Sequence, residues 1–220
     1  MIPPRALPTL DEYFSRWQVL HNAAEVDPRE KVALRLFLSV VYWVARPFAK
    51  AGVSPNVVTI LGLTQGLVGL GLAGPVPIAA SVVILASSLT DGVDGCVAAL
   101  TDRSTRFGAL FDSIADRLTE WCFVAAAVVA GANPWLGVSA AAAIVLFEYT
   151  RARLLAAGLQ EVGPVTVGER PTRVIACVIA VGADAFTDTH LVADVALTVV
   201  VLTSFIAMVQ LLRWAIPRLS

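Results

Sequence analysis

Residues 90–117, TDGVDGCVAALTDRSTRFGALFDSIADR, place four aspartates at helical spacing within an apolar chain. Asp91 and Asp94 are three residues apart, and Asp112 and Asp116 are four apart. Each pair therefore lies on one face of its own helix. A short polar link, 101–105, joins the two halves. We predict a hairpin of two membrane helices that brings the four carboxylates together near the membrane surface.

Such a cluster of like charges needs a positive partner, because neighbouring carboxylates oppose one another's ionisation and acidic groups inside a membrane are costly. The stretch offers carboxylate oxygens and no His or Cys at ligand spacing. This ligand type favours magnesium or manganese, with calcium as a further candidate, over zinc. The competing hypothesis is that the aspartates pair with neighbouring arginines, namely Arg103, Arg106 and Arg117.

Composition indicates an integral membrane protein. The 220 residues are 57% apolar and 15% charged, and several apolar runs approach the roughly 20 residues that cross a bilayer. Ser54 followed by Pro55 is a typical helix start. The predicted fold is all-α, with six transmembrane helices at about 54–74, 75–99, 106–131, 133–157, 170–186 and 191–213. The formal net charge of −1 gives no reason to expect a nucleic-acid partner.

Two helices are expected before the first span. Residues 9–21 place Leu10, Tyr13 and Phe14 at helical spacing opposite charged positions, which predicts an amphipathic helix at the membrane interface. Residues 32–52 are apolar but interrupted by Arg35 and Arg46, which favours an interfacial or slanted helix over a span. We therefore divide the chain into an interfacial part, residues 1–50, and a six-helix membrane domain, residues 51–220.

Lysine and arginine predict the orientation. The connections 71–77, 131–134 and 183–194 contain neither residue, whereas the termini and the opposite connections are basic. By the positive-inside rule, the basic face is cytoplasmic. We expect a multi-pass protein of the plasma membrane with both termini and the aspartate hairpin on the cytoplasmic side.

The pattern Asp91-x-x-Asp94-Gly95-x-x-Ala98, followed by Gly108-x-x-x-Asp112-x-x-x-Asp116, resembles the signature of the CDP-alcohol phosphotransferase family. Enzymes of that family transfer a substituted phosphoryl group from a CDP-linked lipid or alcohol to a hydroxyl and release CMP. The small residues Gly95, Ala98 and Gly108 lie on the aspartate faces and leave room for a nucleotide. One departure is Ala99, where the family usually has Arg.

The resemblance implies a role for each aspartate and a two-metal mechanism. Asp91, Asp94 and Asp112 would be metal ligands, and Asp116 would be a ligand or the general base that deprotonates the acceptor. Two Mg²⁺ ions are expected, with Mn²⁺ as a substitute, because two ions neutralise charge on a pyrophosphate and orient the nucleophile. The resemblance also implies a homodimer.

Arginines near residues 150 and 170 predict an anion site. Two helix ends carry Arg151 with Arg153 and Arg170 with Arg173, and arginine suits bidentate phosphate binding. The alternatives are membrane anchoring, or pairing with Glu148 and Glu169. These stretches and Thr105-Arg106-Phe107 are similar to the actinobacterial phosphatidylinositol-phosphate synthases within the family.

That similarity implies CDP-diacylglycerol as the donor and inositol phosphate as the acceptor. Arg153, Arg170 and Arg173 would bind the acceptor's phosphate, with Arg106 and Arg151 nearby. The stretch Pro55-Asn56-x-x-Thr59 also resembles the family and assigns Asn56 and Thr59 a place near the nucleotide.

Three competing functions remain open from the sequence. Within the family, a phosphatidylglycerophosphate synthase would use glycerol phosphate, and other members would use other alcohols. A cation- or proton-coupled transporter would also place acids in a membrane, although here they gather at one face. A scaffold without catalysis would be consistent with Ala99. We expect Glu120 to be structural, since it can pair with Arg117 one turn before it.

Overall fold

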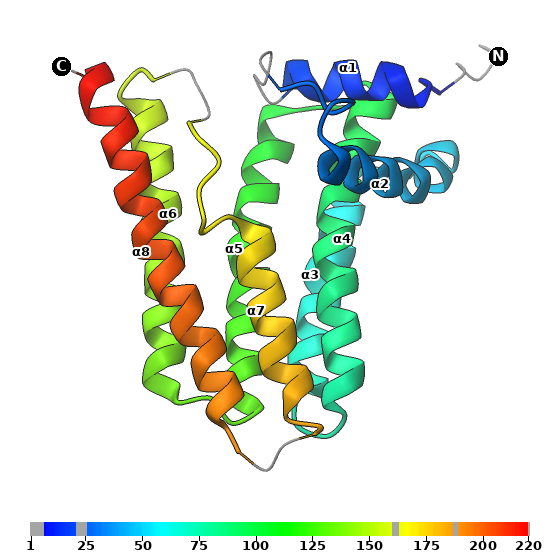
Figure 1. Ribbon diagram of the computed structural model, residues 1–220. Coiled ribbons are helices and arrows are strands. Elements are labelled where there is room, and N and C mark those ends of the chain that lie inside the picture. The colour runs from blue at the N-terminus through cyan, green and yellow to red at the C-terminus, as the bar shows by residue number, and fades with distance from the viewer. Residues whose placement is uncertain (1–6, 21–25, 160–162, 187–188, 220) are drawn as a thin grey trace. The chain divides into compact units, whose positions relative to one another are not determined.

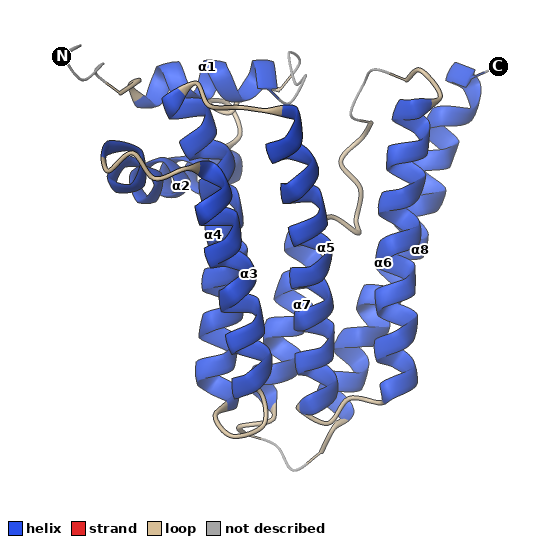
Figure 2. Cartoon of the chain, turned by 180° about the vertical axis from the view of Figure 1, so that it is seen from behind, coloured by secondary structure: helices blue, strands red, loops and turns tan. Residues whose placement is uncertain are grey.

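A computed structural model describes residues 7–20, 26–159, 163–186 and 189–219. Helices joined by loops and turns make up these residues, which contain no strand (Figure 2). They form α1 (Leu10–Leu20), α2 (Val32–Lys50), α3 (Pro55–Leu72), α4 (Pro77–Thr101), α5 (Arg106–Val129), α6 (Pro134–Ala156), α7 (Arg170–Ala183) and α8 (Leu191–Leu219). The all-α prediction is confirmed, and α3 to α8 follow the six apolar segments predicted from the sequence.

Helix starts follow from local sequence. Pro55 opens α3 directly after Ser54, as its fixed φ and missing N–H favour. Asn133 caps α6, where its side chain accepts a hydrogen bond of 2.9 Å from the backbone N–H of Trp135. Pro134 and Pro171 stand in the first turns of α6 and α7. Local chemistry therefore sets where these helices begin.

The chain forms two compact units. Unit 1 contains Met1–Gly62 and Ser88–Asp116, and unit 2 contains Leu63–Ser87 and Arg117–Ser220. The first part of α3, the last part of α4 and the first part of α5 belong to unit 1. Unit 2 holds the remainder of those helices together with α6, α7 and α8.

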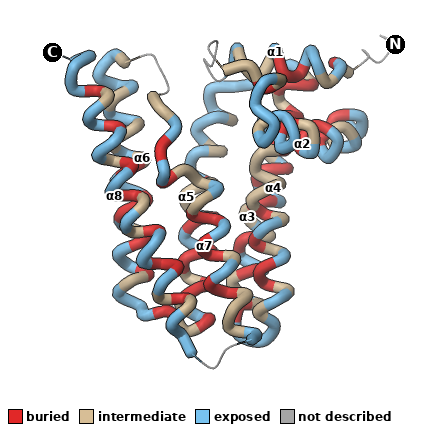
Figure 3. Tube along the Cα trace, viewed as in Figure 1, coloured by how far each residue is buried: buried red, intermediate tan, exposed pale blue. Residues whose placement is uncertain are grey.

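The apolar face of α1 packs into the core of unit 1. Tyr13 and Phe14 are 2% and 3% exposed, and they join a cluster with residues of α2, α3 and α4. The hydroxyl of Tyr42 donates to the carbonyl of Pro8 over 2.9 Å. A helix at this place is confirmed, but much of the apolar stripe that suggested membrane contact is covered by protein (Figure 3).

Helix α2 has two apolar faces. One packs into the unit 1 core through Leu38, Val41 and Tyr42. The other leaves Leu36 and Trp43 each 59% exposed. Figure 1 shows that α1 and α2 lie across the C-terminal half of α4 and do not run along it.

Unit 2 is held by close contacts between helices. Helix α8 packs along both α6 and α7, and the largest buried cluster includes residues from all three (Figure 1). Gly66 of α3 is a point of close approach, because an added Cβ would lie 3.1 Å from a methyl of Thr119 in α5. Small residues thus permit short interhelical distances, as is common in membrane bundles.

Four helices are long and apolar enough to cross a membrane by length and composition: α2, α3, α4 and α8. Helices α5 and α6 carry several ionisable residues, and α7 has only 14 residues. These features explain why their sequences fall short of a simple hydropathy criterion. The chain is accordingly a multi-pass membrane protein.

Candidate metal and substrate site

Three of the four predicted aspartates meet in unit 1. Asp91 projects from the C-terminal half of α4, and Asp112 and Asp116 project from the N-terminal half of α5. One carboxylate oxygen of each lies within 4.8 Å of the others, and all three residues are partly exposed. A cluster of oxygen ligands at this spacing fits a hard divalent cation.

Asp94 lies beside this trio but is more deeply buried, with 3% of its surface exposed. Its carboxylate accepts a hydrogen bond of 2.5 Å from the hydroxyl of Thr59 in α3. It also interacts with Asp112 and Asp116. Thr59, which the family resemblance led us to expect near the nucleotide, orients an aspartate in this structure.

The small residues of the motif have different surroundings. Gly95 is exposed, and a Cβ added to it would have no atom within 4 Å. Gly108 is confined, because an added Cβ would lie 2.9 Å from the Thr105 hydroxyl and 3.3 Å from Oδ1 of Asn56. Ala98 is partly exposed. Open space thus adjoins Gly95, whereas Gly108 is required for packing of the link against α3.

The link between α4 and α5 has a defined geometry. Asp102 has φ 54°, and the N–H of Arg103 donates to the carbonyl of Ala98 over 3.1 Å. This arrangement is a Schellman-type helix end. Nη1 of Arg16, from α1, donates to the carbonyl of Ala99 and to the carboxylate of Asp102, each over 2.6 Å. Sequence reasoning missed Arg16, since a contact across 83 residues leaves no local pattern.

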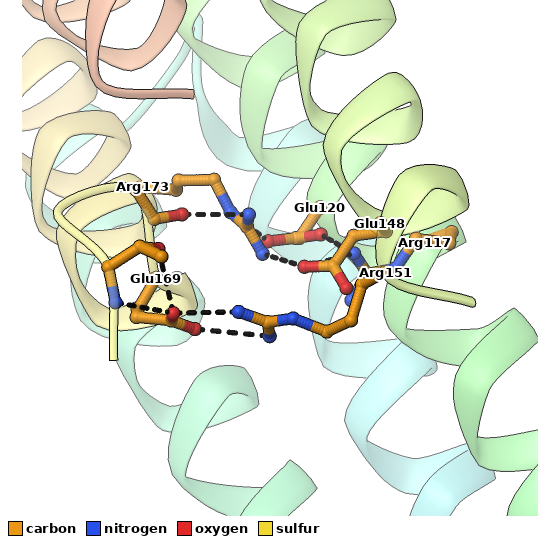
Figure 4. A network of polar contacts seen from close by, with 8 residues as sticks. Arg117, Glu120, Glu148, Arg151, Glu169 and Arg173 are labelled. Carbon is orange, nitrogen blue, oxygen red and sulfur yellow. Dashed lines mark hydrogen bonds and ion pairs between the residues drawn. The ribbon is translucent and has the colours of Figure 1, made fainter. Parts of the chain in front are cut away.

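Three arginines of unit 2, Arg117, Arg151 and Arg173, are held in a network of carboxylates, which Figure 4 shows. Arg173 is 2% exposed, and its Nε donates to Glu120 over 2.8 Å. Its Nη1 donates to the carbonyl of Gly168 and its Nη2 to Glu148, each over 2.9 Å. Arg117 lies 3.0 Å from Glu120 and 3.1 Å from Glu148. The predicted structural pairing of Glu120 with Arg117 is confirmed, and Arg173 is a second partner.

Arg151 is also paired. Its two terminal nitrogens donate to the two oxygens of Glu169 over 2.8 and 3.3 Å. Glu169 accepts further hydrogen bonds from the backbone N–H and hydroxyl of Thr166. Burial alone would raise the pKa of Glu169, but the hydrogen bonds from Arg151 and Thr166 outweigh it and hold the pKa below its ordinary value.

The other predicted phosphate-binding arginines are less enclosed. Arg153, near the end of α6, and Arg106, at the start of α5, are exposed, and Arg170 at the start of α7 is partly exposed. Arg106 belongs to unit 1, whereas Arg151, Arg153, Arg170 and Arg173 belong to unit 2.

Comparison with known proteins identifies the family. The sequence model described as CDP-alcohol phosphatidyltransferase matches residues 52–209, which include all four aspartates. The chain belongs to the CDP-alcohol phosphatidyltransferase family. It is therefore a transferase, and family membership favours this class over the transporter alternative.

Relatives of this transferase include the phosphatidylinositol phosphate synthase of Mycolicibacterium smegmatis, which is 30% identical over 153 residues, covering 63% of this chain and 66% of the relative. A crystal structure of the Mycobacterium tuberculosis phosphatidylinositol phosphate synthase with CDP-DAG bound is 28% identical, with a TM-score of 0.67, over 80% of this chain and 94% of that chain. A second structure of that synthase, in complex with manganese and citrate, is 27% identical, with a TM-score of 0.66, over 80% and 88% of the two chains.

Proposed function

We propose that this transferase moves a phosphatidyl group from CDP-diacylglycerol to inositol phosphate and releases CMP. The observation that carries the proposal is the trio of Asp91, Asp112 and Asp116, whose oxygens lie within 4.8 Å of one another inside the matched family region. The donor and acceptor are proposed from the relatives, which are phosphatidylinositol phosphate synthases.

The aspartates suit two Mg²⁺ ions, with Mn²⁺ as a substitute. Carboxylate oxygens are the ligands that these ions prefer, and a manganese complex exists for a structural relative. Asp91, Asp94 and Asp112 would hold the ions, and Asp116 would contribute an oxygen or act as the base. Bound there, the ions would neutralise charge on the pyrophosphate of the donor.

The transfer needs a proton acceptor as well as charge neutralisation. Asp116 would accept the proton of the acceptor hydroxyl as its oxygen bonds to the lipid-bearing phosphorus. The bond from that phosphorus to the bridging oxygen breaks, and CMP leaves with the electron pair. Thr59 supports this arrangement by fixing the carboxylate of Asp94.

Residues around the aspartates would receive the nucleotide. Gly95 offers open space on the aspartate face, and Ala98 follows it on the same face of α4. Asn56, Thr59 and Gly108 adjoin this region from α3 and α5. We propose these five residues as the lining of the nucleotide site.

The arginines would bind the phosphate of the acceptor. Within unit 2, Arg153 and Arg170 are at least partly exposed at helix ends, which suits direct contact. Arg151 and Arg173 already bind carboxylates, so a direct contact with phosphate requires exchange of these partners. We propose that Arg153 makes the strongest contribution.

We further propose six membrane crossings, α3 to α8, with both termini and the aspartates on the cytoplasmic side of the plasma membrane. Residues 1–50 would form an interfacial part and 51–220 the membrane domain, within a homodimer. The support for an interfacial α2 is its exposed apolar face, with Leu36 and Trp43, and its direction across α4 (Figure 1).

The proposal is tested by supplying detergent-solubilised protein with CDP-diacylglycerol, Mg²⁺ and inositol phosphate. We expect CMP release that depends on all three, and its absence with a panel of polyols and polyol phosphates would refute the transferase assignment. Faster release with glycerol phosphate than with inositol phosphate would instead support a phosphatidylglycerophosphate synthase. Arg153→Ala should raise the KM for inositol phosphate without raising that for CDP-diacylglycerol, and an unchanged KM would refute the assigned phosphate site.

A further inference from the structure

Helix α2 carries positive charge without nearby negative charge in the sequence. Residues 31–90 contain four basic residues, Lys31, Arg35, Arg46 and Lys50, and no Asp or Glu. In the whole chain, by contrast, 16 basic residues are balanced by 17 acidic ones. None of the four side chains forms an ion pair with a described residue. The charge of α2 is therefore available to an anion from outside the chain.

These charges form one strip along the helix. With 3.6 residues per turn, Arg35, Arg46 and Lys50 fall within an arc of about 60° around the helix axis. Lys31 directly precedes the first turn. Arg35 and Lys50 are exposed, and Arg46 is partly exposed. We call these four residues the basic strip.

The basic strip lies between two apolar faces of α2. On one side, Leu38 and Val41 pack into the core of unit 1. On the other side, Leu36 and Trp43 are each 59% exposed and Val40 is 49% exposed. Cations that adjoin an uncovered apolar face are typical of a helix at the boundary between lipid headgroups and acyl chains.

Arg46 has hydrogen-bonding capacity that the described residues do not use. Its Cζ lies 5.5 Å from the ring centroid of Tyr42 and 5.1 Å from that of Trp43. Its Nε is buried and has no hydrogen-bond partner within the described part of the chain. Lys50 is four residues further along, so the two cations lie on adjacent turns and repel each other. A phosphate group between them would accept hydrogen bonds from both and remove this repulsion.

Contacts within unit 1 hold the basic strip in place. Helix α2 packs closely on α4, because a Cβ added to Gly92 would lie 3.2 Å from the ring of Phe37 and 3.3 Å from a methyl of Val41. Tyr42 stacks on Tyr13 of α1, with ring centroids 5.8 Å apart. The helix therefore needs little ordering when a ligand binds, which lowers the entropic cost of binding.

We propose that the basic strip, above all Arg46 with Lys50, binds the headgroup phosphates of anionic phospholipids, whose acyl chains contact the adjoining apolar face. A soluble phosphate would use the cations and leave that face uncovered, whereas a lipid satisfies both. The inference uses the interfacial position proposed for α2, but it does not depend on the proposed donor or acceptor. It assigns lipid selectivity to residues that precede the matched region of 52–209.

The test uses Trp43 as the reporter. Full-length protein is reconstituted into vesicles of phosphatidylcholine and phosphatidylglycerol, one of which carries bromine near the headgroup end of its acyl chains. Bromine quenches the fluorescence of a nearby indole, and the Trp43→Phe variant supplies the signal of the remaining tryptophans. Each protein is normalised to its fluorescence in unbrominated lipid. Brominated phosphatidylglycerol should quench Trp43 at a lower mole fraction than brominated phosphatidylcholine, and added salt should reduce this preference.

Variants of the basic strip test the source of the preference. A positive charge near an anionic membrane surface strengthens binding about fivefold. The double variant Arg46→Gln with Lys50→Gln should therefore weaken phosphatidylglycerol binding about fivefold for each charge removed, with phosphatidylcholine binding nearly unchanged. Arg46→Lys keeps the charge and should keep most of the preference. Arg29→Gln is the matched control, because Arg29 of the same unit already lies 3.3 Å from Asp27.

The preference for phosphatidylglycerol is the decisive readout, because a purely structural role would not distinguish the two lipids. Equal quenching by both brominated lipids in the unsubstituted protein would overturn the inference, as would an unchanged preference in the double variant. Quenching of Trp43 by neither lipid would also overturn it, since protein would then cover this face. CMP release from the same vesicles separates the two proposals: protein that keeps the lipid preference but releases no CMP contradicts the proposed function alone.

Discussion

Replacing Arg173 with methionine should destabilise unit 2 severely. The guanidinium is 2% exposed and donates to Glu120, to Glu148 and to the carbonyl of Gly168 (Figure 4). Methionine keeps much of the aliphatic volume but supplies none of these donors. Glu120 is itself 2% exposed and, within the described part of the chain, would keep the neighbouring Arg117 as its cationic partner.

The expected loss of stability follows from the free-energy cost of leaving the buried Glu120 carboxylate without its Arg173 partner. Removing one partner of a buried ion pair costs about 3–5 kcal/mol, whereas replacing both partners with apolar side chains costs much less. Arg173→Met should therefore lower the free energy of unfolding by about 3–5 kcal/mol. Adding Glu120→Met removes the stranded carboxylate, so the double variant should be more stable than Arg173→Met alone.

Denaturant titration in detergent, followed by the fluorescence of the five tryptophans, measures these free energies. Arg153→Met is the matched control, because Arg153 is exposed and its loss should change the free energy by no more than about 0.5 kcal/mol. An Arg173→Met variant as stable as this control would refute the predicted contribution of Arg173 to stability. So would a double variant whose loss equals the sum of the two single losses, because that result denies any coupling between the residues.

Three further outcomes are expected. Asp91→Asn should abolish CMP release and weaken Mn²⁺ binding measured by calorimetry, with thermal unfolding of the metal-free protein nearly unchanged. Glu169→Gln should be less stable than the unsubstituted protein at pH 7, because pairing with Arg151 lowers the pKa of Glu169. The difference in unfolding free energy should persist above the unfolded pKa of about 4.5 and vanish as the pH falls through the folded pKa. Gly168→Ala should lose about 1–3 kcal/mol of unfolding free energy, since its Cβ would lie 2.7 Å from a carbonyl oxygen of α8, whereas Gly71→Ala, with nothing within 4 Å, should not be destabilised.

The features that could be predicted from sequence are those with local causes. Helices α3, α4 and α6 begin at prolines, and α5 begins after Thr105, whose hydroxyl accepts a hydrogen bond from the N–H of Gly108. The six helices α3 to α8 follow mainly apolar segments, so their positions could be predicted. The proximity of Asp91 to Asp112 and Asp116 could also be predicted. Helical spacing sets the face of the helix on which each aspartate lies, and a short link joins the two helices. These inferences needed no knowledge of distant contacts.

Burial on α1 could not be assigned in the same way. An apolar stripe with Tyr13 and Phe14 has the same pattern whether it faces lipid or protein, because both environments exclude water. The structure covers both side chains with α2 and α4 residues. Only the tertiary contacts distinguish the two cases, and they join separate segments of the chain, as in the stacking of Tyr13 on Tyr42.

The arginines show the same limit of sequence analysis, and this limit affects how the acceptor site can be tested. Arg173 is enclosed by carboxylates, Arg16 caps the end of α4, and Arg153 is exposed, yet all three are equivalent in a sequence that reveals charge but not partners. The Arg173 and Glu120 pair is separated by 53 residues. Because a guanidinium with all three nitrogens engaged cannot bind phosphate without losing a partner, loss of activity in an Arg173 variant would not identify an acceptor site. An Arg153 variant would, since its side chain can be removed without stranding a buried charge.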